Sequence, residues 1–199
     1  MQTSNKLRIK IILGSTRPNR FSDKPGAWIL GEAMKKPGVD AELLDLRDYP
    51  LPFYNEPAPP SMVKDGAYPN ELVRKWAAKI KQADAFILVA PEYNHGISGV
   101  LKNALDSVYA EWNNKAVGFV AYGNVGGARS VEHLRGVAVE LQMAPIRSAV
   151  HIPSPWNMLD EQGNLKPGSL DPFQKSAENF LNQLIWWAKA LKAAREQGN

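Results

Sequence analysis

A group of polar residues follows a short apolar run in the stretch FILVAPEYNHGISGVLKNALD (residues 86–106). Gly96 and Gly99 would let the backbone approach a ligand closely, because glycine has no Cβ. Asn94 could bond the polar edge of a planar ring, and Tyr93 could pack on or beside it. The stretch is therefore either an ordinary turn or one wall of a site for a flat polar molecule. The residues expected to contact that molecule are Pro91, Glu92, Tyr93, Asn94, His95 and Gly96.

The segment GSTRPNRFSDK (residues 14–24) combines hydroxyl groups and positive charge directly after another apolar run. Together with the N–H groups at the start of the following helix, these groups suit a phosphate. The segment matches neither the Walker A pattern nor the dinucleotide pattern G-x-G-x-x-G. The alternative interpretation is a helix cap with solvated arginines. The expected phosphate-binding residues are Ser15, Thr16, Arg17, Arg20 and Ser22.

A third loop, AYGNVGGARSVEHLR (residues 121–135), places Gly123, Gly126 and Gly127 before a helical pattern. Glycines at these positions again indicate close approach of the backbone to a ligand. A glycine-rich loop in isolation is a weak signal. Three such loops at one edge of a sheet would be a much stronger one.

Short apolar runs without alternation predict strands of a parallel sheet that is covered on both faces. The runs are residues 9–13, 41–46, 85–90, 116–122 and 146–152. Helical patterns separate them, and this strict alternation implies a right-handed, doubly wound α/β sandwich. Ligands bind such sheets outside the carboxyl ends of the strands, where the strand order reverses. The loops after the first, third and fourth strands are therefore expected to form one site.

The spacing of apolar residues predicts which face of each helix is buried. The first helix is expected to bury Ala27, Leu30, Ala33 and Met34. The last helix is expected to begin at Asp171, with Pro172 in its first turn. Its packed stripe is expected to comprise Phe173, Phe180, Leu184, Trp187 and Leu191. Trp112 is expected either in the core or at an exposed subunit interface.

Two connections, residues 49–68 and 153–168, are long for a compact domain. Long ordered loops are more often functional than ornamental, although mobile surface loops remain the alternative.

Composition narrows the class of protein. With 199 residues and a mass of 22.0 kDa, the chain is expected to form one domain, residues 1–199. A net charge of +4 from scattered basic residues, without a basic run, argues against nucleic acid as a partner. No apolar run approaches the ~20 residues of a membrane helix, and the N-terminal apolar run is too short for a signal peptide. We therefore expect a cytoplasmic protein with no membrane partner.

The absence of cysteine excludes a disulfide, a thiol nucleophile, an iron–sulfur cluster and a thiolate zinc site. Redox chemistry would therefore need a bound cofactor to carry the electrons. The three histidines, His95, His133 and His151, do not have convincing metal-ligand spacing, so no metal site is predicted. The segment Gly96–Gly99 is one residue short of the G-x-S-x-G nucleophile elbow. His95 could serve as a catalytic base, but no catalytic side chain is assigned.

These loops carry a family resemblance. The chain resembles the NADPH-dependent FMN reductase family of flavodoxin-like proteins, which also holds bacterial chromate, quinone and azo-dye reductases. The resemblance spans roughly residues 7–150. The motifs that carry it are GSTR (14–17), PEYN (91–94), GVLKNALD (99–106), Gly123 and GGAR (126–129).

The resemblance implies a flavodoxin-like fold, with a five-stranded parallel sheet in the order 2-1-3-4-5 and helices on both faces. It implies that Ser15 and Arg17 hold the FMN phosphate, with Ser22 where the family often has asparagine. Residues 91–94 would line the isoalloxazine and ribityl, and residues 123–127 would face the other polar edge of the ring. The chain departs from the family at Arg20, where many members carry a small hydroxyl residue. It also departs at Ser98, which replaces a common proline and is expected only to loosen the turn.

By the same resemblance, NADPH or NADH would reduce FMN, and a small oxidant such as a quinone, flavin, azo compound or chromate would accept the electrons. Family members usually form dimers or tetramers, so a homodimer or homotetramer is expected. One alternative is a non-enzymatic electron carrier of the flavodoxin type, although such carriers are typically acidic and this chain is basic. Another is a hydrolase or a phosphate-binding module without FMN, against which the missing nucleophile elbow argues.

Overall fold

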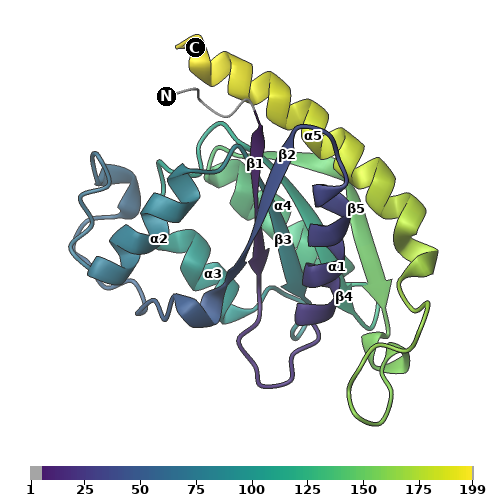
Figure 1. Cartoon of the computed structure of the whole chain (residues 1–199). Coiled ribbons are helices and arrows are strands. Elements are labelled where there is room, and N and C mark those ends of the chain that lie inside the picture. Colours follow the sequence, from purple (N-terminus) through teal and green to yellow (C-terminus); the bar gives the residue numbers. More distant parts are fainter. Residues whose placement is uncertain (1–5, 199) are drawn as a thin grey trace.

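The computed structural model describes residues 6–198, and its centre is a five-stranded parallel sheet (Figure 1). The strands are β1 (Leu7–Leu13), β2 (Val39–Asp45), β3 (Ala85–Pro91), β4 (Ala116–Gly123) and β5 (Ala144–Pro153). Their order is β2-β1-β3-β4-β5, and every neighbouring pair is parallel. The flavodoxin-like topology expected from the sequence is confirmed. The second strand begins two residues earlier than predicted, and the last strand extends further at both ends.

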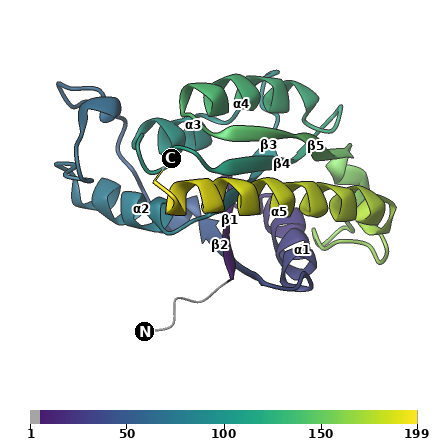
Figure 2. The ribbon, with the colours of Figure 1, turned by 90° about the horizontal axis from the view of Figure 1, so that it is seen from above.

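Helices cover both faces of this sheet (Figure 2). They are α1 (Asp23–Met34), α2 (Glu71–Lys81), α3 (Gly99–Asp106), α4 (Ala128–Glu140) and α5 (Gln174–Glu196). One hydrophobic cluster joins the sheet to α2, α3 and α4, and a second joins it to α1 and α5. β3 is buried along its whole length, which explains why its sequence is a continuous apolar run rather than an alternating one.

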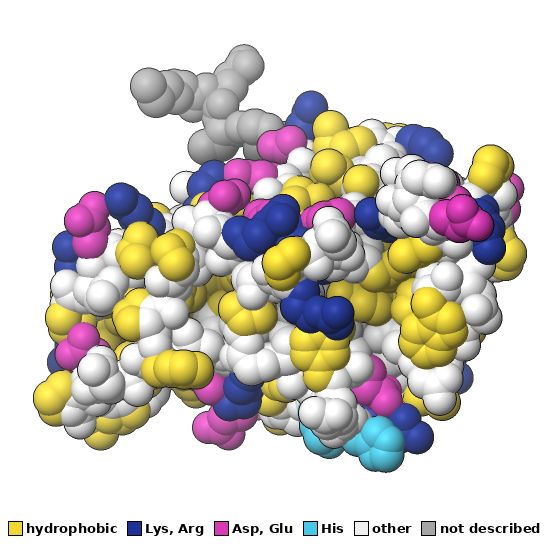
Figure 3. All heavy atoms as spheres, turned by 90° about the horizontal axis from the view of Figure 1, so that it is seen from below, with side chains coloured by type: hydrophobic (Ala, Val, Ile, Leu, Met, Phe, Trp, Pro, Cys, Tyr) yellow, Lys and Arg dark blue, Asp and Glu magenta, His cyan; other side chains and the backbone are white. Residues whose placement is uncertain are grey.

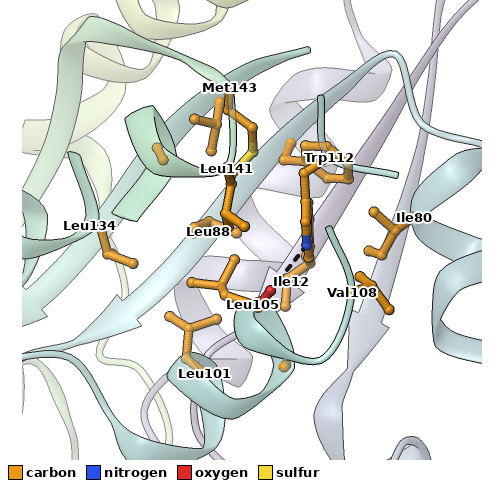
Figure 4. Close-up of a cluster of buried hydrophobic side chains, with 14 of the residues drawn as sticks. Ile12, Ile80, Leu88, Leu101, Leu105, Val108, Trp112, Leu134, Leu141 and Met143 are labelled. Carbon is orange, nitrogen blue, oxygen red and sulfur yellow. Dashed lines mark hydrogen bonds between the residues drawn. The ribbon is translucent and has the colours of Figure 1, made fainter. Parts of the chain in front are cut away.

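Trp112 belongs to the core and not to an exposed interface. Its side chain is 0% exposed, and its Nε1 donates a hydrogen bond to the Leu105 carbonyl at 3.2 Å (Figure 4). Phe86 and Trp76 meet its ring edge-on, with centroids 4.7 and 6.1 Å away. The indole is both fully packed and hydrogen-bonded, which is what a buried tryptophan needs.

The predicted face of the first helix is confirmed at Ala33 and Leu30, which pack in the core, and wrong at Ala27 and Met34. α1 buries Pro25, Gly26, Ile29 and Ala33, whereas Ala27 and Met34 are exposed. A Cβ on Gly26 would lie 2.4 Å from the Leu13 side chain, so the helix sits against β1 on its smallest residues. A glycine at a close contact contributes little to an apolar pattern, so the prediction missed Gly26 and included two exposed residues instead.

The last helix also differs from the prediction at two points. α5 begins at Gln174, because Asp171–Phe173 form a 3₁₀ turn before it. Its buried stripe is Ala177, Phe180, Leu181, Leu184 and Ala188. Trp187 lies beside that stripe, 38% exposed, and its ring meets the exposed Trp186 edge-on. Of the described helices, none is long and apolar enough to span a bilayer.

Candidate functional site

Three connections meet where the carboxyl ends of β1, β3 and β4 open onto one face (Figure 1). They are tied together by hydrogen bonds between chain segments far apart in sequence. The Gly14 N–H donates to the Val89 carbonyl at 2.8 Å, and the Glu92 N–H donates to the Tyr122 carbonyl at 2.9 Å. The juxtaposition of these loops, expected from the strand order, is therefore present in the structure.

A pocket of about 330 Å³ opens between these loops. Figure 3 looks onto this face, where basic side chains lie beside hydrophobic ones near the centre and histidines lie at the rim. The lining residues are Arg17, Asn19, Arg20, Phe21, Pro91, Glu92, Tyr93, Tyr122, Gly123, Pro155, Trp156 and Leu159. The set is both aromatic and basic, which suits a flat ring that carries an anionic group.

The β1–α1 loop joins the β3–α3 loop through one hydroxyl pair. Ser15 is buried, and its Oγ lies 2.9 Å from the Tyr93 hydroxyl. The Arg17 guanidinium lies over the Tyr93 ring, 5.9 Å from its centroid. Arg17 is exposed and forms no ion pair with any residue between 6 and 198. Its charge is therefore available to an anion at the pocket mouth.

Arg20, by contrast, is committed to protein partners. Its Nε donates to Asp23 at 2.8 Å, and its two terminal nitrogens donate to Asp45, Asp23 and the Ser15 carbonyl. A guanidinium has five N–H donors, and these contacts use all of them. Arg20 lines the pocket, but holding a phosphate would cost it one of these bonds, and its expected role in phosphate binding stays a prediction.

Ser22 and Thr16 occupy different sides of the same loop. Ser22 precedes α1 and is fully buried, and its Oγ has no hydrogen-bond partner in the described part of the chain. Thr16 does not face this pocket. It lines a second hollow of about 320 Å³ with residues of the β2 end and α3, among them Tyr49 and Asn103. Thr16 therefore faces a different hollow from Arg17 and Arg20, and its expected contact with the phosphate stays a prediction.

The PEYNHG turn has an unusual backbone. Tyr93 and Gly96 exchange two N–H···O bonds of 3.0 Å, and the two residues between them, Asn94 and His95, have φ angles of 49° and 66°. Both central residues of this tight turn are left-handed, a geometry that asparagine tolerates better than most residues. Asn94 and His95 are exposed and do not line the pocket, and Gly96 lies against the His133 imidazole.

Glu92 lines the pocket, and its negative charge is paired with Arg129 of α4. Its carboxylate accepts bonds from the Arg129 N–H at 3.0 Å and from the Arg129 guanidinium at 2.6 Å. Burial would raise the pKa of Glu92, but these bonds outweigh it and hold the pKa below its usual range. The pair also fixes the β3–α3 turn to the start of α4.

The β4–α4 loop needs its glycines for close packing. A Cβ on Gly123 would lie 3.0 Å from the Glu92 Cβ, and one on Gly126 would lie 2.9 Å from the His151 Cβ. Gly127 has a φ of 71° and precedes the first residue of α4. Only Gly123 of the three lines the pocket. Gly126 and Gly127 act by bringing the loop down onto the end of the sheet.

Ser98 tightens the turn rather than loosening it, contrary to expectation. Its Oγ donates to the Gly14 carbonyl and accepts from the Leu101 N–H at 3.3 Å, which caps α3. A proline at this position has a fixed φ but no hydroxyl, so it could make neither bond. The serine hydroxyl caps the helix and also joins two loops of the site.

Sequence reasoning missed six lining residues, which are Asn19, Phe21, Tyr122, Pro155, Trp156 and Leu159. Tyr122 and Phe21 form an aromatic pair with ring centroids 5.1 Å apart, and burial raises the pKa of the Tyr122 hydroxyl to about 12. Tyr122 is the last residue of the apolar run 116–122, directly before the first glycine of the loop, so its position was a usable signal. Trp156 comes from the long connection after β5, whose course the sequence does not reveal.

Comparisons with known proteins give the family. The family model described as NADPH-dependent FMN reductase matches residues 7–157. An NAD(P)H-dependent FMN reductase of Schizosaccharomyces pombe is 37% identical over 148 residues, which cover 73% of this chain and 74% of that protein. A probable NADPH:quinone oxidoreductase of rice (Oryza sativa subsp. japonica) is 34% identical over 195 residues, or 94% of this chain and 91% of that protein.

A solved structure supports the fold. The flavoenzyme FerB of Paracoccus denitrificans, an NAD(P)H:(acceptor) oxidoreductase, superposes with a TM-score of 0.71 at 20% identity. The superposition covers 92% of this chain and 98% of that one. The loops described above lie within the span that the family model matches, and the chain belongs to the NADPH-dependent FMN reductase family.

Proposed function

We propose that this protein is an FMN-dependent NAD(P)H oxidoreductase that passes electrons to a small oxidant such as a quinone, a flavin, an azo compound or chromate. The observation that carries the proposal is the pocket itself, in which Arg17, without an ion-pair partner among residues 6–198, lies at the mouth of an aromatic cavity. The names of the relatives, which are FMN reductases and quinone oxidoreductases, support the same chemistry.

The phosphate end of FMN is assigned to the β1–α1 loop. Arg17 supplies positive charge, and Ser15 supplies a hydroxyl that already points toward Tyr93. Ser22 has a buried hydroxyl without a partner at the start of α1. An unpaired buried hydroxyl costs free energy, and a phosphate oxygen that reached Ser22 behind the pocket lining would remove that cost. The residues present therefore fit a phosphate.

The ring end is assigned to Pro91, Glu92, Tyr93 and Gly123, which line the pocket. Bound FMN would supply the chemistry, accepting a hydride from the nicotinamide and giving electrons to the oxidant. The protein orients the ring, and its backbone N–H groups stabilise negative charge on it. Asn94, His95 and Gly96 stand at the rim, where they would meet the incoming nicotinamide or oxidant. No side chain is assigned to proton transfer.

The remaining expectations belong to the same proposal. Residues 1–199 form a single FMN-binding domain, the protein is cytoplasmic, and neither nucleic acid nor a membrane is a partner. The continuity of both hydrophobic clusters across the whole sheet supports the single domain.

Anaerobic reduction tests the function. The purified protein, loaded with FMN, is mixed with NADPH or NADH, and the loss of flavin absorbance is followed before reoxidation by a panel of quinones. Bleaching by either nucleotide without a partner reductase is expected. An electron carrier of the flavodoxin type would bind FMN but fail to bleach, and that outcome would replace the reductase by the alternative.

The oligomeric state has a separate test. The connection 49–68 carries Phe53 and Met62, which are 82% and 70% exposed, and two bonds from Asn103 to the Leu51 and Pro52 carbonyls hold it in place. A fixed segment that exposes large apolar side chains is typical of an interface. Replacing Phe53 and Met62 by serine is expected to shift a wild-type homodimer or homotetramer toward monomer in sedimentation velocity.

The matched control is Val139→Ser, because Val139 is 64% exposed on α4 and outside this segment. It is expected to leave the sedimentation coefficient unchanged. A wild-type monomer would refute the oligomer, and an oligomer that survives the double substitution would place its interface elsewhere.

A further inference from the structure

Trp156 is a large apolar side chain that is 57% exposed and yet lines the pocket. It belongs to the connection after β5, outside the three loops on which the resemblance rests. The other tryptophans with comparable exposure, Trp186 and Trp187, lie on α5 and line neither hollow described above. Exposure of an indole at a pocket mouth therefore calls for a separate explanation.

The backbone around Trp156 is held firmly. The Ser154 N–H donates to the Gly123 carbonyl at 2.9 Å, which ties the connection to the β4–α4 loop. Pro155 is buried and starts a short 3₁₀ helix, Pro155–Met158. The Asn157 N–H then closes the turn on the Ser154 carbonyl at 3.0 Å. The indole is thus presented by a fixed turn and not by a loose loop.

Bonds among residues 158–166 also stabilise the turn. Leu159 and Leu165 form an isolated antiparallel bridge, and the Lys166 N–H donates to the Met158 carbonyl at 2.9 Å. Asp160 accepts bonds from the Gln162 and Asn164 N–H groups at 3.0 and 2.8 Å. The connection 153–168 is therefore an ordered wall beside the pocket.

The backbone of Ser154 is strained, and the contacts around it must offset the free energy of that strain. Its φ of 46° is left-handed, which a serine adopts only under constraint. The strained residue directly precedes Pro155 and Trp156 and carries the bond to Gly123. Strained backbone persists where the surrounding contacts over-determine it.

We propose that Trp156 is a ring-binding residue, whose indole forms the wall of the pocket against which the isoalloxazine of FMN lies. The inference rests on the proposed function. It divides the pocket into two ends, with Arg17 facing the phosphate and Trp156 facing the ring. Indole and isoalloxazine are both flat and polarisable, and rings of this kind attract one another when they stack or meet edge-on.

A comparison of two ligands distinguishes binding at the ring end of the pocket from binding at the phosphate end. Riboflavin has the ring and the ribityl but no phosphate, so the ratio of its Kd to that of FMN measures the phosphate contribution. Full-length protein stripped of flavin is titrated with each ligand by calorimetry. Trp156→Ala is expected to weaken FMN and riboflavin by the same factor, about tenfold for the loss of one stacked aromatic side chain. Arg17→Ala is expected to weaken FMN alone.

Fluorescence gives a readout that does not depend on affinity. FMN is expected to quench part of the tryptophan emission of the wild type, and Trp156→Phe is expected to remove most of that quenched part while keeping most of the affinity. The matched control is Trp186→Phe, which changes an equally exposed indole on α5. It is expected to lower total emission without changing the quenched part.

The outcomes are distinguishable. A wild type that binds neither ligand refutes the proposed function. A wild type that binds FMN, with Trp156→Ala binding both ligands equally well, refutes the role of Trp156 alone. If Trp156→Ala weakened FMN but spared riboflavin, the indole would belong to the phosphate end, and the inference would be wrong.

Discussion

Replacing Asp45 by alanine is expected to lower the free energy of unfolding by about 3 kcal/mol, because it leaves a buried guanidinium without its main partner. Asp45 ends β2, and its carboxylate accepts from both terminal nitrogens of Arg20, whose side chain is only 1% exposed. Asp23 remains as a second partner, which limits the loss. Urea denaturation followed by circular dichroism measures the change.

The same variant is expected to bind FMN more weakly. Arg20 donates to the Ser15 carbonyl, and Ser15 carries the hydroxyl that meets Tyr93. Without Asp45, the guanidinium loses the contact that ties the β1–α1 loop to the end of β2. Arg20 therefore acts on the phosphate end through the position of Ser15. A rise in the Kd for FMN, with that for riboflavin less affected, is the expected pattern.

The contribution of Asp45 also depends on pH. Burial would raise the pKa of Asp45, but hydrogen bonds from Arg20 and Arg47 outweigh it and hold the pKa well below its usual range. The folded state therefore releases this proton more readily than the unfolded state. The stabilisation is fully present above the unfolded pKa of about 4 and is lost as the pH falls below it. The difference between wild type and Asp45→Ala is expected to shrink between about pH 5 and pH 3.

Glu71→Ala is the control for removing a carboxylate from an ion pair. Glu71 pairs with Lys75 across one turn of α2, and both side chains are largely exposed, 70% and 63%. Exposed pairs contribute little, so no clear change in urea midpoint is expected. If Asp45→Ala behaved like this control, the buried Arg20 pair would not stabilise the β1–α1 loop.

The fold was predictable because its signals are local. β3 and β4 are buried nearly throughout, so each reads as one apolar run, and helices separate the strands at regular intervals. The helix faces were less predictable where small residues make the contact. Gly26 and Ala177 lie against the sheet, but neither contributes much to an apolar pattern. Close packing on glycine and alanine depends on the partner surface, which a single sequence does not show.

The sequence predicted which loops form the site, but it predicted few of the contacts between their side chains. Strand order brought residues 14–22, 91–96 and 123–127 to one face, and the structure confirms that proximity. Side-chain partners could not be read in the same way. Asp45 accepts hydrogen bonds from Arg20, although 25 positions separate the two in sequence. Trp156 reaches the pocket only because the connection after β5 folds back to Gly123.

Substituting alanine for Gly127 is expected to lower the free energy of unfolding by about 3 kcal/mol, the sum of a left-handed backbone penalty and a clash. Gly127 has a φ of 71°, and its added Cβ would lie 2.7 Å from the Ala121 Cβ and 2.8 Å from the Tyr122 backbone nitrogen. Both atoms belong to β4, which is paired on both sides and cannot shift alone. The β4–α4 loop would therefore move away from the end of β4.

The same substitution can be made at Gly136, where an added Cβ has free space around it. It lies inside α4, and an added Cβ would meet nothing within 4 Å. Alanine there is expected to raise the free energy of unfolding by about 0.5–1 kcal/mol, because glycine is the poorer helix former. Measured side by side in urea, the two glycine-to-alanine changes should have opposite signs. Only Gly127→Ala should also weaken FMN, since only that glycine holds a loop of the pocket against the sheet. Equal and small effects at both positions would mean that the close approach of this loop to β4 is not required.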